Sequence, residues 1–358
     1  MIIILFVICG GSIHYLRLPA KTVAEKSNLK ERLAEVTEKI FEIRNKALLK
    51  KKKSMLKGLY NREIKTGQWA YEHELKKMKY LQQWSAKQGV DFKGIASEIE
   101  LRRVQEKEDS LLVTLLVSTK YQYVYHDSPS KYNNFRIGTY HSLKLMFKDE
   151  KLLISREWYK DPFANSLHLD EINQQQVQKI IAQQSKNLNK LKKRRRTVVE
   201  YADQYCGAAS LPQYGFKYNS QYKNYNYQGG DCANFASQML HEGGKFKKNR
   251  VWNYKRGAGT KAWVNAQAFN RYMVYSNRAT KIAYGSYLKV LKASYKLLPG
   301  DYIAYEKQGQ VEHISVVTGV DSKGYRLVNC HNSDRYRVPW DLGWNNKGVK
   351  FWLVRVHY

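Results

Sequence analysis

One of the four cysteines, Cys232, stands where a helix is expected to begin. Apolar residues follow it at helical spacing, and a pair of glycines closes the segment: Phe235, Ala236, Met239, Leu240, Gly243 and Gly244. Asp231 is a favourable N-cap residue, so we interpret it as a helix cap rather than a catalytic acid. Because the free N–H groups and dipole of a helix N-terminus favour a thiolate, the pattern predicts Cys232 as a nucleophile.

A cysteine nucleophile needs a base from another part of the fold, and His313 is the candidate. It stands at the start of the β-rich run 312–320, after a turn and strand over 298–305. A histidine at the start of a strand that packs on the Cys232 helix would take the thiol proton.

The chain returns after His313 as a second strand, and the length of the turn decides which residue faces His313. A three-residue loop pairs Val320 with Gly324 and places His331 opposite His313. A two-residue loop places Asn332 there instead. Either side chain could orient the imidazole as the third member of a triad does.

The remaining cysteines carry no metal or disulfide pattern. They are widely separated and form no CxxC pair. We therefore expect Cys206 and Cys330 to be core thiols.

The segment around Cys232 carries a longer signature, in which many positions are fixed: Asp231-Cys232-x-Asn234-Phe235-x-Ser237-Gln238-x-Leu240-x-x-Gly243-Gly244. It resembles the bacterial putative amidase domain family, a branch of the papain-like cysteine hydrolases. Three further elements agree with the resemblance over 197–358: Tyr201-Ala202, Leu298-Pro299-Gly300-Asp301, and His313 followed by His331-Asn332-x-Asp334. The sequence departs from the family at Ala233, where Thr is usual, and in the Tyr- and Asn-rich stretch 211–228.

The resemblance implies an α+β fold in which the Cys232 helix packs on an antiparallel sheet bearing His313. It implies a cysteine-dependent amide hydrolase with catalytic Cys232, His313 and His331, and with no metal or organic cofactor. Bacterial cell-wall peptidoglycan, or another peptide amide, is the expected substrate. Two alternatives stay open: a catalytically inactive wall-binding module, and a protease or transamidase that acts on proteins.

The N-terminal half has a different pattern. Residues 26–84 read as helical, with the lysine run 50–53 on a solvated face, and a period of two from about residue 95 predicts an antiparallel sheet. The hairpin over 141–159 resembles those of cystatin-like and nuclear-transport-factor-two-like accessory domains. We therefore predict a non-catalytic helical and curved-sheet domain over 26–165 and a polar basic linker over 166–196, ahead of the amidase domain at 197–358.

Charge and the N-terminus bear on partners and location. Lys and Arg outnumber Asp and Glu 62 to 31, a formal charge of +31, which favours anionic partners such as a wall polymer. We find no RNA-recognition, zinc-finger or basic-zipper pattern, which argues against nucleic acid. Residues 1–25 open on an apolar run, 2–16, that we interpret as a signal or membrane anchor. An extracellular or outer-face, membrane-anchored protein is the expectation.

Overall fold

The structure is a computed structural model that describes residues 23–148, 151–163, 172–184, 191–344 and 348–358. The predicted signal or anchor lies almost wholly outside these residues. Among the helices of the described part, none combines the length and apolar character that a membrane crossing requires.

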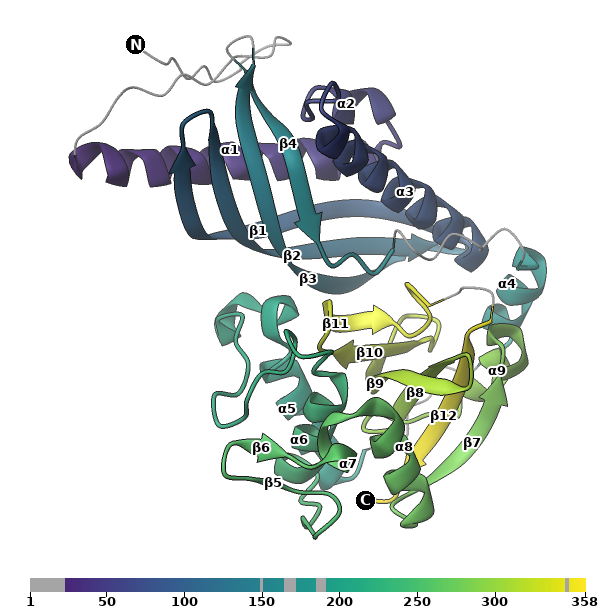
Figure 1. Cartoon of the computed structure of the whole chain (residues 1–358). Helices are drawn as coiled ribbons and strands as arrows, with labels where there is room; N and C mark the ends of the chain where they lie inside the picture. The colour runs from purple at the N-terminus through teal and green to yellow at the C-terminus, as the bar shows by residue number, and fades with distance from the viewer. Residues whose placement is uncertain (1–22, 149–150, 164–171, 185–190, 345–347) are drawn as a thin grey trace.

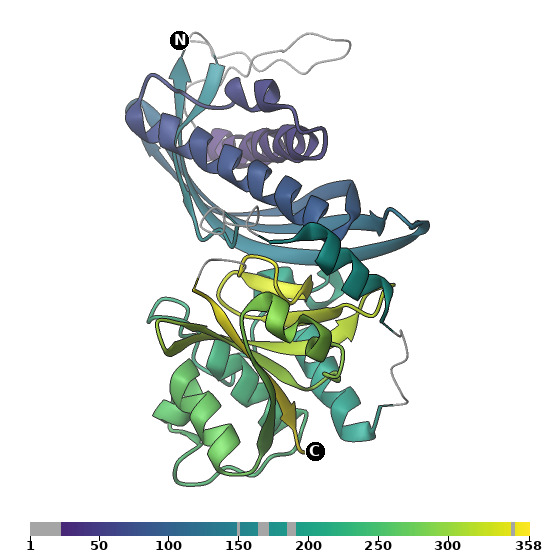
Figure 2. The same cartoon turned by 90° about the vertical axis from the view of Figure 1, so that its right-hand side faces the viewer.

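The N-terminal half is a helical layer on a long, bent sheet. The predicted helical region forms α1 (Val23–Leu49), α2 (Lys53–Lys57) and α3 (Lys65–Gln88). The helix is interrupted at the lysine run, between α1 and α2. Four antiparallel strands follow: β1 (Val90–Lys107), β2 (Ser110–Tyr125), β3 (Ser128–Lys148) and β4 (Lys151–Tyr159). Helices α1 and α3 lie along the concave side of this sheet (Figures 1 and 2).

The C-terminal half is also a mixture of helices and antiparallel strands, as predicted. Its helices are α5 (Lys193–Gln204), α6 (Cys232–Glu242), α7 (Lys261–Val264), α8 (Ala266–Tyr275) and α9 (Tyr287–Ser294). Its main strands are β7 (Ala279–Gly285), β8 (Tyr302–Lys307), β9 (Gln310–Val320), β10 (Arg326–Cys330), β11 (Asp334–Pro339) and β12 (Lys350–Val356). Short strands β5 (Tyr254–Lys255) and β6 (Ala258–Gly259) form a separate hairpin, and α4 (Gln174–Ala182) lies within the predicted linker.

The two halves share one sheet. Its order is β1-β2-β3-β11-β10-β9-β8-β12-β7, and β4 pairs with the far part of β3. The junction is the antiparallel pairing of β11 with β3, in which Arg335 faces Ile137. A buried ion pair between Lys87 of α3 and Asp341 also joins the halves, and one hydrophobic core extends across both. The N-terminal half is therefore built against the sheet that carries His313.

The predicted basic linker differs from the structure at its end. The run 192–196 enters helix α5, and Arg195 is only 7% exposed. Its guanidinium donates to the carboxylate of Asp301 at 2.8 Å and to the carbonyls of Pro299 and Val356. Arg194 donates to the carbonyl of Gly244. The interpretation of this run as solvated was wrong for Arg195, whose acceptors lie far along the chain, whereas Arg194 remains exposed.

The predicted strand register was also wrong. Val320 pairs with Arg326, so the loop has five residues, 321–325, and a shift follows after Leu327. A hydrogen bond from the Asp321 N–H to the Tyr325 carbonyl closes this wider loop. Neither His331 nor Asn332 pairs with His313 in the ladder, because β10 ends at Cys330.

Candidate active site

Cys232 is the first residue of α6, as the sequence predicts, and its side chain is 4% exposed. Burial raises the pKa of the thiol to about 12, and a hydrogen bond from the backbone N–H of Ile314 acts in the opposite direction. The expectation of a thiolate stabilised by the helix terminus is therefore wrong for this state. The thiol is protonated at neutral pH and needs a base.

Polar residues of the Cys232 signature hold α6 in place through hydrogen bonds. Trp263 donates its indole N–H to the side-chain oxygen of Asn234, and Trp252 donates to the hydroxyl of Ser237, both at 2.9 Å. Gln238 accepts a hydrogen bond from Tyr201. Both tryptophans are fully buried, and they pack against the helix that begins at Cys232.

His313 lies in β9 with its ring packed between aromatic side chains. The ring stacks on Trp344 at 4.9 Å between centroids and lies 5.5 Å from Tyr305. Its Nε2 is buried and has no hydrogen-bond partner among the described residues. Burial, then the charges of Arg335 and Lys160, lower the pKa of His313 well below its ordinary value. The imidazole is therefore neutral at physiological pH and can accept a proton.

Cys232 and His313 lie on two elements that pack together, α6 and β9. Helix α6, which begins at Cys232, packs against β9, and Cys232 shares a buried cluster with Ile314, the residue after His313. Between the side chains of Cys232 and His313, both within the described residues, no direct hydrogen bond is formed in this state. A catalytic hydrogen bond is often long or misaligned before substrate binds.

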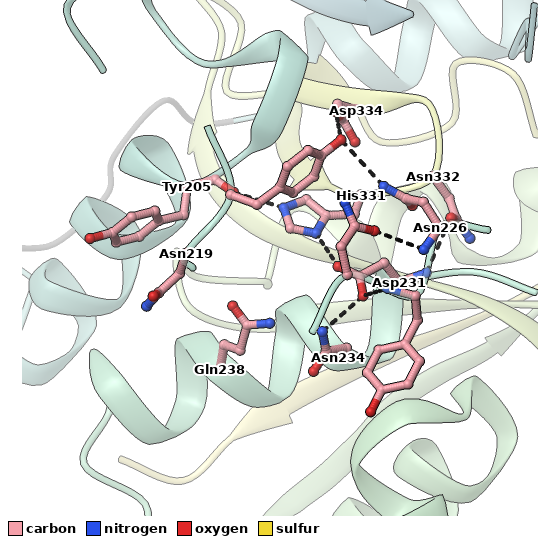
Figure 3. Close-up of polar contacts among 12 residues, drawn as sticks. Tyr205, Asn219, Asn226, Asp231, Asn234, Gln238, His331, Asn332 and Asp334 are labelled. Carbon is pink, nitrogen blue, oxygen red and sulfur yellow. Dashed lines mark hydrogen bonds and ion pairs between the residues drawn. The ribbon is translucent and has the colours of Figure 1, made fainter. Parts of the chain in front are cut away.

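His331 lies beside Asp231, at the start of α6 (Figure 3). Its Nδ1 contacts the carboxylate of Asp231 at 2.5 Å, and its Nε2 contacts the carbonyl oxygen of Tyr205 at 2.7 Å. The ring stacks on Phe235 of α6 at 4.1 Å. Both nitrogens are thus occupied, and neither orients the imidazole of His313.

The protonation of His331 follows from these two partners. A backbone carbonyl only accepts, so Nε2 carries a proton, and an ionised Asp231 requires a second proton on Nδ1. Burial alone lowers the pKa of His331, but the hydrogen bond and charge of Asp231 outweigh it and raise the pKa. Below this raised pKa, His331 is an imidazolium that forms an ion pair with Asp231.

Asp231 occupies the N-cap position without capping the helix backbone. Its carboxylate accepts instead from the Tyr225 N–H and the Asn234 side chain, both at 2.8 Å, in addition to His331. Our interpretation of this carboxylate as a helix cap was therefore wrong. Sequence reasoning missed its pairing with His331 because the two lie 100 positions apart.

Asn332 supports the loop before Cys232. It has a left-handed φ of 69°, and its side-chain oxygen accepts the Asp231 N–H at 3.1 Å. Gly230 adopts a φ of 133°, and a Cβ there would lie 2.1 Å from the Asn332 side-chain nitrogen. The glycine before Asp231 thus allows close approach of Asn332, which holds the loop before Cys232.

The Tyr- and Asn-rich stretch braces the same region. Tyr218 donates to the carboxylate of Asp334, which also accepts the Ala208 N–H at 2.8 Å, and Asn226 donates to Tyr218 (Figure 3). Burial raises the pKa of Asp334 to about 6. Cys206 and Cys330 are buried free thiols, as predicted.

Comparisons with known proteins agree with the resemblance in part. Residues 192–354 match the family described as "Putative amidase domain", which indicates amide hydrolysis in general terms. The chain is 31% identical over 134 residues to "Uncharacterized protein YhbB" of Bacillus subtilis (strain 168). The match covers 35% of this chain and 39% of that relative, so the chain spans about two fifths of the relative's length. No solved structure matches the chain.

Proposed function

We propose that the chain hydrolyses amide bonds with Cys232 as nucleophile and His313 as general base. The observation that carries the proposal is the position of the thiol at the first residue of α6, a helix that packs against the strand of His313. The match of residues 192–354 to an amidase family supports the same reaction class. The papain-like character of the fold is part of this proposal.

The proposed reaction begins from a neutral pair. As the Cys232 sulfur attacks the amide carbonyl carbon, neutral His313 takes the thiol proton. The tetrahedral intermediate collapses, the C–N bond breaks, and His313 returns the proton to the leaving amine. Water then attacks the thioester, His313 takes one of its protons, and the carboxylic acid leaves while the proton returns to the sulfur.

The start of α6 supplies the oxyanion site in this scheme. The first backbone N–H groups of a helix have no partner inside the helix, and they point toward its N-terminus. Cys232 stands at that end, so an oxyanion formed on the attacked carbonyl meets these donors.

We assign His331 to positioning rather than to proton transfer. Its nitrogens hold Asp231 and the Tyr205 carbonyl, and Asp231 holds the Tyr225 N–H and the Asn234 side chain. This network fixes the loop that precedes the nucleophile. The triad function first expected of His331 is thereby replaced by an indirect one.

For the substrate we propose peptidoglycan of a bacterial wall, reached by an exported or outer-face protein. The formal charge of +31 supports binding to an anionic wall polymer. A protein-directed protease or transamidase would use the same residues and differ in its substrate alone. A catalytically inactive binding module would retain the fold without thiol reactivity.

The test is digestion of purified bacterial wall, followed by mass spectrometry of the released fragments. We expect wild type to release new amine and carboxyl ends in equal amounts, and Cys232→Ala and His313→Ala to release none. Cleavage of casein but not wall would favour the protease alternative. Binding to wall without cleavage by wild type would favour the inactive module.

A further inference from the structure

Arg335 is a buried cation that has no carboxylate partner among the described residues. It lies in β11 at the junction with β3, and it is 2% exposed. Its Nη1 donates to the carbonyl of Leu342, while its Nε has no partner among the described residues. No carboxylate of the described residues lies within ion-pair distance of it. A buried charge is costly when it is left unpaired.

Other buried cations of this protein are compensated. Arg44 pairs with Glu74 and Glu157, and Arg195 pairs with Asp301. Arg326 lacks a carboxylate but donates to three carbonyl oxygens, those of Leu297, Gly324 and Tyr295. Arg335 differs from these residues because it has one carbonyl acceptor and an unused N–H.

Other buried nitrogen atoms without a hydrogen-bond partner among the described residues lie near Arg335. The guanidinium of Arg335 lies 5.9 Å from the ring of Trp344, which stacks on His313 at 4.9 Å. The indole nitrogen of Trp344 and the Nε2 of His313 are both buried and without a partner among the described residues. Three residues in contact thus present nitrogen atoms that a ligand can satisfy.

A second cation comes from the N-terminal half. Lys160 directly follows β4, and its carbonyl accepts a hydrogen bond from the Ser333 hydroxyl at 3.1 Å, two positions before Arg335. Its side chain is exposed. Arg335 and Lys160 both lower the pKa of His313, which indicates that both charges act at that residue.

We propose that Arg335, together with Lys160, forms a subsite for a carboxylate of the substrate next to His313. The proposal rests on the hydrolase function above and adds its specificity: the enzyme prefers amide bonds that have a free carboxylate nearby. A carboxylate is planar and matches the fork of N–H donors on a guanidinium. The N-terminal half then serves in substrate selection, since it supplies Lys160 and pairs with the strand of Arg335.

The test measures binding without turnover. N-acetylglutamate and its uncharged analogue, N-acetylglutamine amide, are titrated into the full chain, and the imidazole signals of His313 are followed by NMR. We expect the acid to shift these signals at a concentration at least tenfold lower than the diamide. Arg335→Met should weaken binding of the acid about tenfold to a hundredfold, the range for loss of a hydrogen bond to a charged group.

Three variants control the experiment. Arg335→Lys retains the charge and should recover part of the affinity, and Lys160→Met should lower affinity less because this side chain is exposed. Lys255→Met removes an exposed cation elsewhere in the C-terminal half and should bind as wild type does. Circular dichroism checks folding. If Arg335→Met does not fold, the proposal is tested by the preference of wild type for the acid over the diamide and by the loss of affinity in Lys160→Met.

Equal affinity for the acid and the diamide would overturn the subsite, as would a folded Arg335→Met that binds like wild type. Because no bond is cleaved in this assay, the result is separate from that of wall digestion. Carboxylate binding without hydrolysis would leave the subsite standing and remove the proposed reaction.

Discussion

Replacing Asp231 by Asn removes one charge from the buried pair with His331 while keeping the size of the side chain. The amide oxygen of the variant can still accept from the Tyr225 N–H and Asn234. Its NH₂ group then faces Nδ1 of His331, which must lose its proton to accept a hydrogen bond. The substitution therefore converts an imidazolium into a neutral ring with little change in shape.

The expected change in unfolding free energy follows from the loss of the charged hydrogen bond between Asp231 and His331. A hydrogen bond to a charged group contributes about 1.5–3 kcal/mol, and breaking a buried ion pair outright costs about 3–5 kcal/mol. The Asn side chain keeps the other bonds, so we expect the lower range, about 2–3 kcal/mol of unfolding free energy near pH 6. We also expect slower turnover, because the network positions the loop before Cys232.

The loss should depend on pH. The pKa of His331 is raised in the folded protein above its ordinary value of 6.5. The stabilisation from its pair with Asp231 is therefore fully present below pH 6.5 and is lost as pH rises through the raised folded value. The difference between wild type and Asp231→Asn should shrink accordingly at alkaline pH.

The assay is urea unfolding at pH 6 and pH 9, combined with NMR titration of the His331 ring. Asp127→Asn is the matched control, because its carboxylate pairs with Lys323 at an exposed site and should change stability little. An equal loss of stability at both pH values would refute the reasoning. So would a wild-type His331 that titrates at or below 6.5.

Three further predictions concern the buried arginine, the loop glycine and the base. Arg195→Met should lower the unfolding free energy by about 1.5–3 kcal/mol in denaturant titration, because Asp301 loses one charged partner and keeps Arg355, while exposed Arg196→Met should change it little. Gly230→Ala should lower stability and turnover more than Gly229→Ala, since only at Gly230 does the added Cβ meet a neighbour, Asn332. The acid limb of kcat/KM against pH should lie well below 6.5, following the lowered pKa of His313, and a limb above 6.5 would contradict a neutral base.

Local patterns predicted the elements around the nucleophile. The helix that begins at Cys232 and ends at Gly243 follows from apolar spacing and a glycine stop, both of which are read within about a dozen residues. The strands at His313 and after the loop follow in the same way from β-rich runs. These patterns are local, so the elements can be predicted without knowledge of the tertiary structure.

Features that depend on distant partners could not be predicted. The loop 321–325 has five residues, and β10 ends at Cys330, before His331. His331 instead contacts Asp231, 100 positions away. Arg195 is buried because Asp301 lies under it, and no local pattern distinguishes it from its exposed neighbour Arg196. The pairing of β11 with β3 likewise depends on strand edges nearly 200 residues apart in the chain.

The central claim, that neutral His313 activates the buried thiol of Cys232, is tested most directly by the rate of iodoacetamide alkylation against pH, read by peptide mass spectrometry. We expect Cys232 to react before Cys206 and Cys330 in the folded wild type. The alkylation rate should decrease when the pH is lowered below the pKa of His313. In His313→Ala the reaction should become slow at neutral pH and rise only as the thiol approaches its pKa of about 12. Alkylation of Cys206 or Cys330 first, or an unchanged profile in His313→Ala, would contradict the account.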